Sequence, residues 1–503
     1  MRRQRPGPIL ARYLTKSCTV PVAAACGALL ACLWVMGHGV GHPWALEWME
    51  GGMVETAMRL RAGESIYPAP SVDFVGYVYT PLYFAIAGAL GALTGGDLAA
   101  ARTVSALAAL VSFALVAWWV WRETRSAWAA AAGAGLLAAC QGLAGFWYHL
   151  ARVDSLFLAL LLAALLAMAC GTRARSAVLA GALGTLAVLT KQAALLALLP
   201  ALAGLAFVDA RRAGIASVTL LGATLVSFAV LTAVTDGWFL YYTVDLPGQH
   251  GLELRDALVH GAGRMATLAP ACLACGLYLV PAIRRGERRA RMLGAMLAGL
   301  VLCAWLGLAH PGGHWNVLLP ACAGLAIVTP VAAWSLHGSS RLAPAARAAV
   351  PLVLALQIAL PIVPWPPWGG VAPATDVARG ERFVSWLASQ PGEPLLPDAP
   401  LVEARAGKPV HGLGMAARDV LRARRDDRGR RMLEESLATA LADRRFSVIV
   451  TTERDWLGGA LELAYEPAGR APEAPRPITG WPSRPTWVWR PRPTPSAHDA
   501  SEM

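Results

Sequence analysis

The feature that most constrains this chain is a series of apolar stretches that recurs from residue 19 to residue 364. Each is about 20 residues long, which as a helix crosses the ~30 Å hydrocarbon core of a bilayer. The 503-residue chain has 56% hydrophobic and only 15% charged residues, a composition unlike that of a soluble domain. We therefore expect an α-helical polytopic membrane protein with about 11 membrane helices, at residues 19–37, 103–121, 127–146, 155–170, 176–190, 193–208, 215–234, 265–283, 292–309, 316–335 and 347–364.

The basic residues predict which way these helices run, because loops rich in Lys and Arg stay in the cytoplasm. The N-terminus and every second loop carry 18 basic residues and three acidic ones, the basic ones being Arg2, Arg3, Arg5, Arg12, Lys16, Arg122, Arg125, Arg173, Arg175, Arg211, Arg212, Arg284, Arg285, Arg288, Arg289, Arg291, Arg341 and Arg347. A cytoplasmic N-terminus and an odd number of crossings put the C-terminal end outside. Most of the net charge of +12 reflects this bias, so we infer no nucleic-acid partner.

The composition changes near residue 365 and divides the chain into a membrane domain, residues 1–365, and a soluble end. Residues 366–465 alternate helical and strand-like segments and favour a small extracytoplasmic α/β domain. Residues 466–503 are rich in Pro and Trp without periodicity, so we expect an irregular tail. Within the membrane domain, the apolar segment 82–93 is too short to span and is expected to lie on the membrane surface as a helix.

The first outer loop, residues 39–101, is longer than a connector needs to be, and such loops are usually functional or disordered. Apolar residues at helical spacing from Leu46 predict an amphipathic surface helix. Glu47 and Glu50 lie three residues apart on it, so one or both could face a cavity and act as a general base. The alternative is a pair of ordinary solvated carboxylates, which the spacing alone favours.

Polar residues at the outer ends of further helices lie on the same predicted face of the membrane. Ionisable groups at a membrane boundary are costly and tend to mark function, and the residues in question are Arg152, Asp154, Lys191, Gln192, His314 and Asn316. Each has a structural alternative, as a salt bridge, a snorkelling cation or an interfacial side chain. With Glu47 or Glu50 they supply what cleavage of a sugar–phosphate bond requires, since it needs a base for the nucleophile and cations for the departing phosphate.

Cysteine and histidine predict no metal or redox site. All nine Cys residues lie in or beside apolar helices, and Cys272 and Cys275 form a lone CxxC in mid-helix, where packing is the simpler explanation. His38 and His42 are expected at the membrane interface. No cofactor is assigned, and a divalent cation is left open.

These motifs resemble the GT-C class of polytopic glycosyltransferases, in particular the bacterial group similar to lipid A aminoarabinose transferases and protein O-mannosyltransferases. The resemblance spans roughly residues 30–325 and rests on an acidic motif, an aromatic run and polar helix ends, at residues 47–52, 63–68, 77–83, 152–154, 190–192 and 316–320. Many members carry an Asp-Glu pair, whereas this chain has Met49-Glu50 with Glu47 upstream.

The resemblance implies inverting transfer of a sugar from a polyprenyl-phosphate donor to a lipid, glycan or protein acceptor at the outer face of a bacterial inner membrane. It implies Glu47 or Glu50 as the base, and a substrate site that holds Tyr79, Arg152, Asp154, Lys191, Gln192, His314 and Asn316.

The alternative is a polytopic transporter or lipid-carrier flippase without transferase chemistry. A transporter predicts functional charge near the bilayer midplane, whereas here the charges collect at one surface, and we find no inverted repeat.

Overall fold

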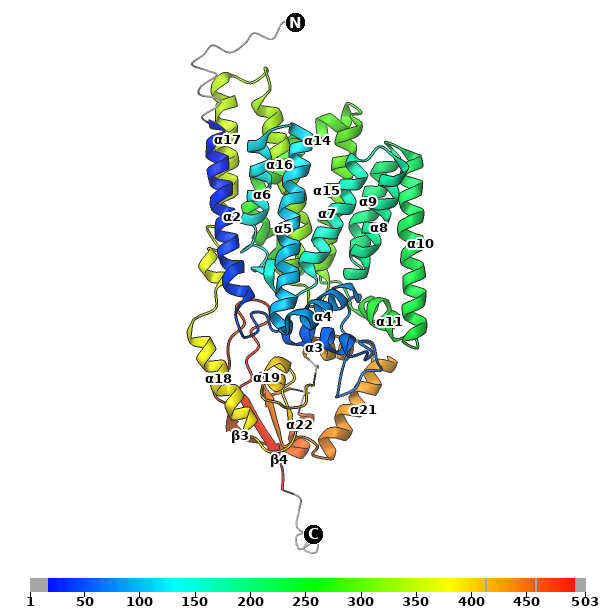
Figure 1. The fold of residues 1–503 in the computed structure, drawn as a ribbon, viewed down its shortest axis with the longest axis vertical. Helices are drawn as coiled ribbons and strands as arrows, with labels where there is room; N and C mark the ends of the chain where they lie inside the picture. Colours follow the sequence, from blue (N-terminus) through cyan, green and yellow to red (C-terminus); the bar gives the residue numbers. More distant parts are fainter. Residues whose placement is uncertain (1–16, 412–413, 457–458, 494–503) are drawn as a thin grey trace, which may run out of the picture.

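The computed structural model describes residues 17–411, 414–456 and 459–493, which form a long helical bundle with a smaller domain at one end (Figure 1). The basic N-terminal residues used to predict orientation, Arg2 to Lys16, lie outside the described residues. The last helix of the bundle ends at Ala359, and the first long helix of the smaller domain begins at Thr375. The composition change near residue 365 therefore coincides with the passage from one part to the other.

All eleven predicted membrane segments are helical, namely α2 (Thr19–Val40), α5 (Asp97–Thr124), α6 (Ala127–Ala139), α7 (Asp154–Cys170), α8 (Ala174–Thr190), α9 (Ala194–Ala206), α10 (Ala210–Val234), α14 (Ala269–Arg284), α15 (Arg288–Ala309), α16 (Leu319–His337) and α17 (Pro344–Ala359). Among the described residues, six helical runs are long and apolar enough to cross a bilayer, and the other apolar helices are shorter. The chain is therefore a multi-pass membrane protein, and eleven crossings stay a prediction.

Two helix boundaries differ from the prediction in ways that matter for the site. Helix α5 begins at Asp97 rather than at residue 103, so Arg102 lies within it. Helix α6 ends at Ala139 rather than at residue 146, and the chain continues in turns to a left-handed Phe146. Helix α5 therefore begins earlier than the hydropathy pattern predicted and includes a charged residue, and a buried turn replaces the predicted end of α6.

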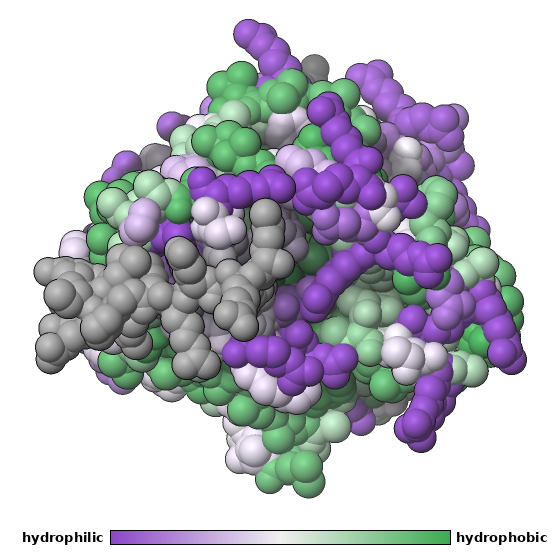
Figure 2. All heavy atoms as spheres, turned by 90° about the horizontal axis from the view of Figure 1, so that it is seen from above, coloured by the Kyte–Doolittle hydropathy of each residue, from purple (hydrophilic) through white to green (hydrophobic). Residues whose placement is uncertain are grey.

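The loops that were predicted to be cytoplasmic all lie at one end of the bundle, opposite the C-terminal domain (Figure 1). Figure 2 views this end, and hydrophilic side chains gather across it. The exposed basic residues of these loops include Arg125, Arg173, Arg175, Arg211 and Arg284. The clustering supports the predicted orientation, because a face this rich in Arg resists translocation.

The first outer loop contains two helices that lie between the bundle and the C-terminal domain, α3 (Glu50–Arg61) and α4 (Leu82–Thr94) (Figure 1). Helix α4 confirms the predicted helix at 82–93. The two helices pack closely at Gly88, where an added Cβ would lie 2.7 Å from the Ala57 carbonyl oxygen. The helix expected from Leu46 begins only at Glu50, so Glu47 precedes α3 and does not share a helix with Glu50.

The remaining outer connections are built from short helices, namely η1 (Trp147–His149), α11 (Trp238–Leu240), η2 (Tyr241–Asp245), α12 (Leu246–Gln249), α13 (Leu254–Met265), η3 (Ala266–Leu268), η4 (Trp315–Leu318) and η5 (Pro367–Gly370). They hold the outer loops in defined positions against the ends of the membrane helices.

The C-terminal domain is a four-stranded mixed sheet with helices, which agrees with the small α/β domain that was predicted. Its helices are α18 (Thr375–Ala388), α19 (Pro400–Arg405), α20 (Gly414–Leu421), α21 (Arg428–Ala442) and α22 (Ala460–Ala464). The strand order is β1-β2-β4-β3, where β1 (Pro394–Leu395) is parallel to β2 (Val448–Thr451), and β4 (Trp487–Pro491) is antiparallel to both β2 and β3 (Tyr465–Arg470). Phe383, Leu387 and Val448 are buried in its core.

The predicted irregular tail at 466–503 is wrong where β3 and β4 complete the sheet, whereas residues 471–486 between them form no helix and no named strand. Strand β3 gave no alternating signal, since every residue of it after Tyr465 is exposed. Strand β4 pairs on both edges and buries Trp489. Residues 494–503 of that prediction lie outside the described residues.

Candidate active site

A cavity of about 1020 Å³ lies where the first outer loop, the bundle and the C-terminal domain meet. Its lining includes eight of the nine residues predicted for the site, from five separate stretches of sequence: Glu47, Tyr79, Arg152, Asp154, Lys191, Gln192, His314 and Asn316. Glu50 is the exception and does not line the cavity.

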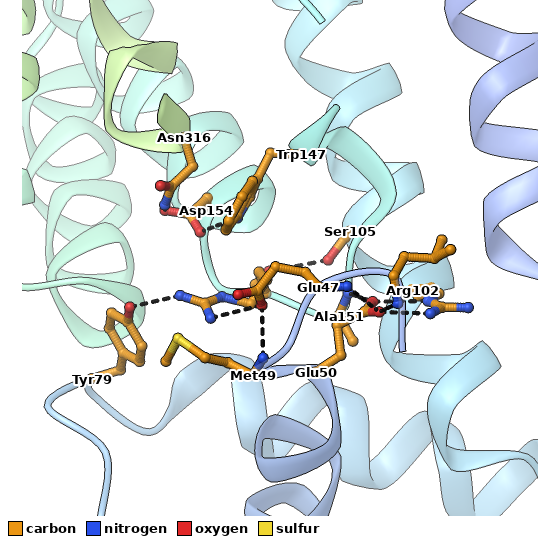
Figure 3. A network of polar contacts seen from close by, with 12 residues as sticks. Glu47, Met49, Glu50, Tyr79, Arg102, Ser105, Trp147, Ala151, Asp154 and Asn316 are labelled. Carbon is orange, nitrogen blue, oxygen red and sulfur yellow. Dashed lines mark hydrogen bonds and ion pairs between the residues drawn. The ribbon is translucent and has the colours of Figure 1, made fainter. Parts of the chain in front are cut away.

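Glu47 is 1% exposed and lines the cavity, and Figure 3 shows its polar contacts. Its Oε2 accepts hydrogen bonds from Arg152 Nη1 at 3.0 Å and from the Met49 amide at 3.2 Å. Its Oε1 is buried without a hydrogen-bond partner among the described residues. Burial raises the pKa of Glu47 to about 7, against the opposing effect of Arg152. The carboxylate is thus anchored through one oxygen and has the other available, with a proton affinity suited to a base near neutral pH.

Glu50 has a different environment, in which both oxygens are occupied. Its carboxylate forms a two-point ion pair with Arg102, with distances of 2.8 Å and 2.6 Å, and accepts hydrogen bonds from the amides of Ala151, Leu46 and Glu47. Although burial opposes ionisation, Arg102 and these amides hold the pKa of Glu50 below its usual value. Glu50 therefore joins the first loop to α5 and to the chain before α7.

Arg152 is the cation nearest to Glu47. Its Nη1 donates to Glu47 and its Nη2 donates to the Tyr79 hydroxyl at 2.8 Å (Figure 3). The Tyr79 and Trp147 rings both lie near the guanidinium, with ring centroids 5.6 Å and 5.5 Å from its carbon. Arg152 Nε has no partner among the described residues. The guanidinium is held by protein groups on one side and retains a free donor.

Asp154 and Lys191 form a second buried ion pair, with Lys191 Nζ 2.7 Å from Asp154 Oδ1. The Asn316 amide also donates to Oδ1, and the Trp147 indole donates to Oδ2. The hydrogen-bond partners of Asp154 are thus Lys191, Asn316 and Trp147. The ammonium group of Lys191 has two further protons with which to contact an anion.

Gln192 and His314 complete the predicted set. The Gln192 amide nitrogen donates to the carbonyls of Val78 and Thr243, so it joins the first loop to η2. His314 packs against the Trp147 ring at 5.3 Å between centroids. Burial, with Arg264 and Arg152 nearby, lowers the pKa of His314 to about 4, so it is a neutral hydrogen-bonding group at physiological pH.

Unpaired polar atoms are concentrated at this cavity. Seven of its side chains keep a buried nitrogen or oxygen without a hydrogen-bond partner in the described part of the chain, namely Glu47 Oε1, Arg152 Nε, Gln192 Oε1, Thr224 Oγ1, His310 Nε2, His314 Nδ1 and Arg418 Nε. Buried polar groups are nearly always paired in folded proteins, so such a cluster indicates a site that binds a polar ligand.

The membrane side of the cavity is apolar. Leu196 of α9, Leu225 and Phe228 of α10 and Leu306 of α15 line it. Leu225 is also 69% exposed on the outside of the bundle. The cavity therefore extends from the polar site toward the lipid-facing surface between membrane helices.

Sequence reasoning missed the contribution of the C-terminal domain. Four residues of this domain line the cavity at spacings that place them on one helix face: Met415, Arg418 and Asp419 of α20, and Arg422 directly after it. Burial raises the pKa of Asp419 to about 7, although Arg422 donates to it at 3.2 Å. No local signal in the sequence indicated that this helix would cover the site.

The described residues contain no group of three or more His, Cys, Asp or Glu side chains placed to hold a metal ion.

Comparisons with known proteins agree with this architecture. Residues 79–235 match the family model described as dolichyl-phosphate-mannose-protein mannosyltransferase. The structure is similar to that of ArnT from Cupriavidus metallidurans bound to undecaprenyl phosphate, with 14% identity, a TM-score of 0.56, and coverage of 93% of this chain and 97% of that one. It is also similar to the archaeal oligosaccharyltransferase AglB from Archaeoglobus fulgidus, with 13% identity, a TM-score of 0.55, and coverage of 90% and 73%. No curated protein sequence matches the chain. At these identities the two structures establish a shared fold, and the predicted resemblance to this group of polytopic glycosyltransferases is confirmed.

Proposed function

We propose that this membrane glycosyltransferase transfers a sugar from a polyprenyl phosphate to an acceptor hydroxyl, with inversion at the sugar and with Glu47 as the base. The observation that carries the proposal is the Glu47 carboxylate, which is buried at the cavity, anchored by Arg152 through one oxygen and unpaired at the other. The ArnT structure contains undecaprenyl phosphate and the AglB structure contains a dolichol phosphate, both of which are polyprenyl phosphates.

The donor phosphate is proposed to bind between Lys191 and Arg152. Both side chains line the cavity, and each has donor capacity that its carboxylate partner does not use. When the sugar–phosphate bond breaks, negative charge grows on the phosphate, and preorganised cations in a site with little water stabilise that charge. The apolar side of the cavity, lined by Leu196, Leu225 and Leu306, would take the first isoprene units of the carrier.

Glu47 is proposed to accept the proton of the acceptor hydroxyl as its oxygen attacks the anomeric carbon. The new carbon–oxygen bond forms on the face opposite the phosphate, the old bond breaks, and the electron pair leaves with the phosphate on its carrier. The proton ends on Glu47 Oε1, the oxygen without a protein partner. A single displacement of this kind inverts the anomeric centre.

Glu50 is not proposed as the base, although both glutamates were candidates in the sequence. Arg102 and three backbone amides occupy its oxygens, so a proton transfer there would break the ion pair. Its proposed role is to hold the loop that carries Glu47.

The proposed setting is a bacterial inner membrane, with the N-terminus in the cytoplasm and the C-terminal domain outside. The acceptor is a lipid, a glycan or a protein, as the resemblance implies. The steps above use only side chains of this chain.

The proposal is tested by complementing a deletion strain with Glu47→Gln and measuring carrier-linked sugars by mass spectrometry. A strain without transfer accumulates the unspent polyprenyl-phosphate sugar, which also identifies the donor. We expect Glu47→Gln to accumulate it like the empty vector, because a neutral amide cannot take the proton. Glu64→Gln is the matched control, because Glu64 is an exposed carboxylate of the same loop that forms a salt bridge with Arg59. Normal clearance by Glu47→Gln would overturn the proposal.

A further inference from the structure

The C-terminal domain sends one segment, residues 477–482, back to the first outer loop. The amides of Ile478 and Thr479 both donate to the Leu46 carbonyl, at 2.8 Å and 3.3 Å. Glu47 and Thr479 form an isolated parallel β-bridge. The segment therefore pairs with the backbone of the residue that we propose as the base.

Gly480 brings this segment against the Glu47 side chain. Its φ is +80°, and an added Cβ would lie 2.8 Å from Glu47 Oε1 and 2.9 Å from Trp48 Cδ1. A side chain at this position would be strained by the backbone and would also displace the carboxylate. The next residue, Trp481, packs edge-on against Trp48 at 5.3 Å between ring centroids.

Besides contacting Glu47, the segment lines the cavity. Gly480, Trp481 and Pro482 form part of the cavity wall, and Arg418 stacks on the Trp481 ring at 4.4 Å. The free oxygen of Glu47 thus lies between the proposed donor site and this wall. Two glutamate oxygens have two different neighbours: Arg152 fixes Oε2, and the Gly480 backbone limits where Oε1 can go.

We propose that residues 478–481 are a positioning element of the active site, which holds the Glu47 carboxylate in place against Arg152 and keeps water from it. The inference rests on the proposed function, because it assigns a role relative to Glu47. It also explains why the chain returns to the membrane domain between β3 and β4, where a short hairpin would otherwise join two antiparallel neighbours.

Exclusion of water by this segment contributes to the burial that raises the pKa of Glu47 to about 7. The charged groups that face Glu47 are Arg152, which favours its ionised form, and Glu50, which disfavours it. Asp419 from α20 lines the same cavity. A change in the segment should therefore alter both the placement and the proton affinity of Glu47, while Lys191 keeps its ion pair with Asp154.

The test compares Gly480→Ala with Gly469→Ala in the full-length protein, using donor purified from the deletion strain. Gly469 is the matched control, since its φ is +98° and an added Cβ meets nothing within 4 Å. We expect Gly480→Ala to lower kcat on the order of 10²-fold, as a misplaced catalytic group does, with the KM for donor little changed. The acid limb of its pH–rate profile should move by about half a unit or more. Gly469→Ala should keep the acid limb of the wild-type profile. If this substitution only reduces the amount of folded protein, the rate falls by the same factor at every pH.

A profile for Gly480→Ala that matches Gly469→Ala would overturn the inference. If Gly480→Ala is not recovered as folded protein, Pro477→Gly provides the second test, because it loosens the segment without placing an atom near Glu47. It should admit water and move the acid limb to lower pH, and an unchanged limb again overturns the inference. Either failure leaves the proposed function intact if Glu47→Gln is inactive, whereas an active Glu47→Gln removes the proposed function itself.

Discussion

Substituting Glu50 and Glu47 by Gln should separate stability from catalysis. Glu50 and Arg102 are both 0% exposed, and Glu50 accepts five hydrogen bonds, two from Arg102 and three from backbone amides. Breaking a buried ion pair typically costs 3–5 kcal/mol, because it leaves a buried charge without its counter-ion. Arg102 keeps the carbonyls of Gly39, His42 and Trp44 as acceptors. We therefore expect Glu50→Gln to destabilise the protein by about 3 kcal/mol, at the lower end of that range.

Glu47→Gln should have the opposite profile. Burial raises the pKa of Glu47 from an ordinary value near 4.5 to about 7, so the folded protein binds more protons than the unfolded chain between these values. Stability consequently falls as the pH rises through this window. A pKa shift of this size lowers the folding stability of the wild type by about 3 kcal/mol above the window. A Gln at this position is neutral at every pH, so the variant does not lose this stability. At pH 8 the Glu47→Gln protein should be at least as stable as the wild type and yet inactive.

Both variants are measured at pH 8 in lipid nanodiscs, by thermal unfolding and by transfer from purified donor. The assignment of the two roles would be refuted if Glu47→Gln unfolded at a much lower temperature than the wild type while Glu50→Gln unfolded at the wild-type temperature. So would wild-type transfer by Glu47→Gln at any pH.

Two further predictions concern the pH profile and the donor site. The raised pKa of Glu47 predicts that kcat/KM falls as the pH drops through about 7. Asp419→Asn should leave this fall in place, although the pKa of Asp419 is also about 7. If the fall disappears in Asp419→Asn, it is caused by Asp419 and not by Glu47. Lys191→Met should raise the KM for donor on the order of 10-fold or more, since a hydrogen bond to a charged group contributes about 1.5–3 kcal/mol, while Lys191→Arg retains part of the affinity; an unchanged KM for Lys191→Met in steady-state kinetics would move the phosphate elsewhere.

Hydropathy and charge were sufficient to predict the helices and the end of the bundle at which the site lies. Long apolar runs predict helices buried in lipid, and Arg-rich loops predict the cytoplasmic end of the bundle, opposite the cavity. Arg152, Lys191 and Asn316 were found because each stands at the outer end of a membrane helix, where a polar side chain is conspicuous. Their common cavity followed from the alternation of the helices.

Which of the two glutamates keeps an unpaired oxygen could not be predicted, because it depends on partners remote in sequence. Arg102 occupies Glu50 from 52 residues away and appeared to lie just before a membrane helix. Gly480 abuts Glu47 from a segment whose Pro and Trp content suggested no structure. Neither contact leaves a periodic signal, since each is a single long-range approach and not a repeated pattern.

The most direct test of the central claim is an experimental structure of Glu47→Gln with the polyprenyl-phosphate sugar that accumulates in its host. The phosphate should contact Lys191 and Arg152, the isoprene chain should leave between α10 and α15, and the anomeric carbon should face residue 47. A phosphate held at the Arg-rich opposite end of the bundle, or a sugar remote from residue 47, would contradict the account.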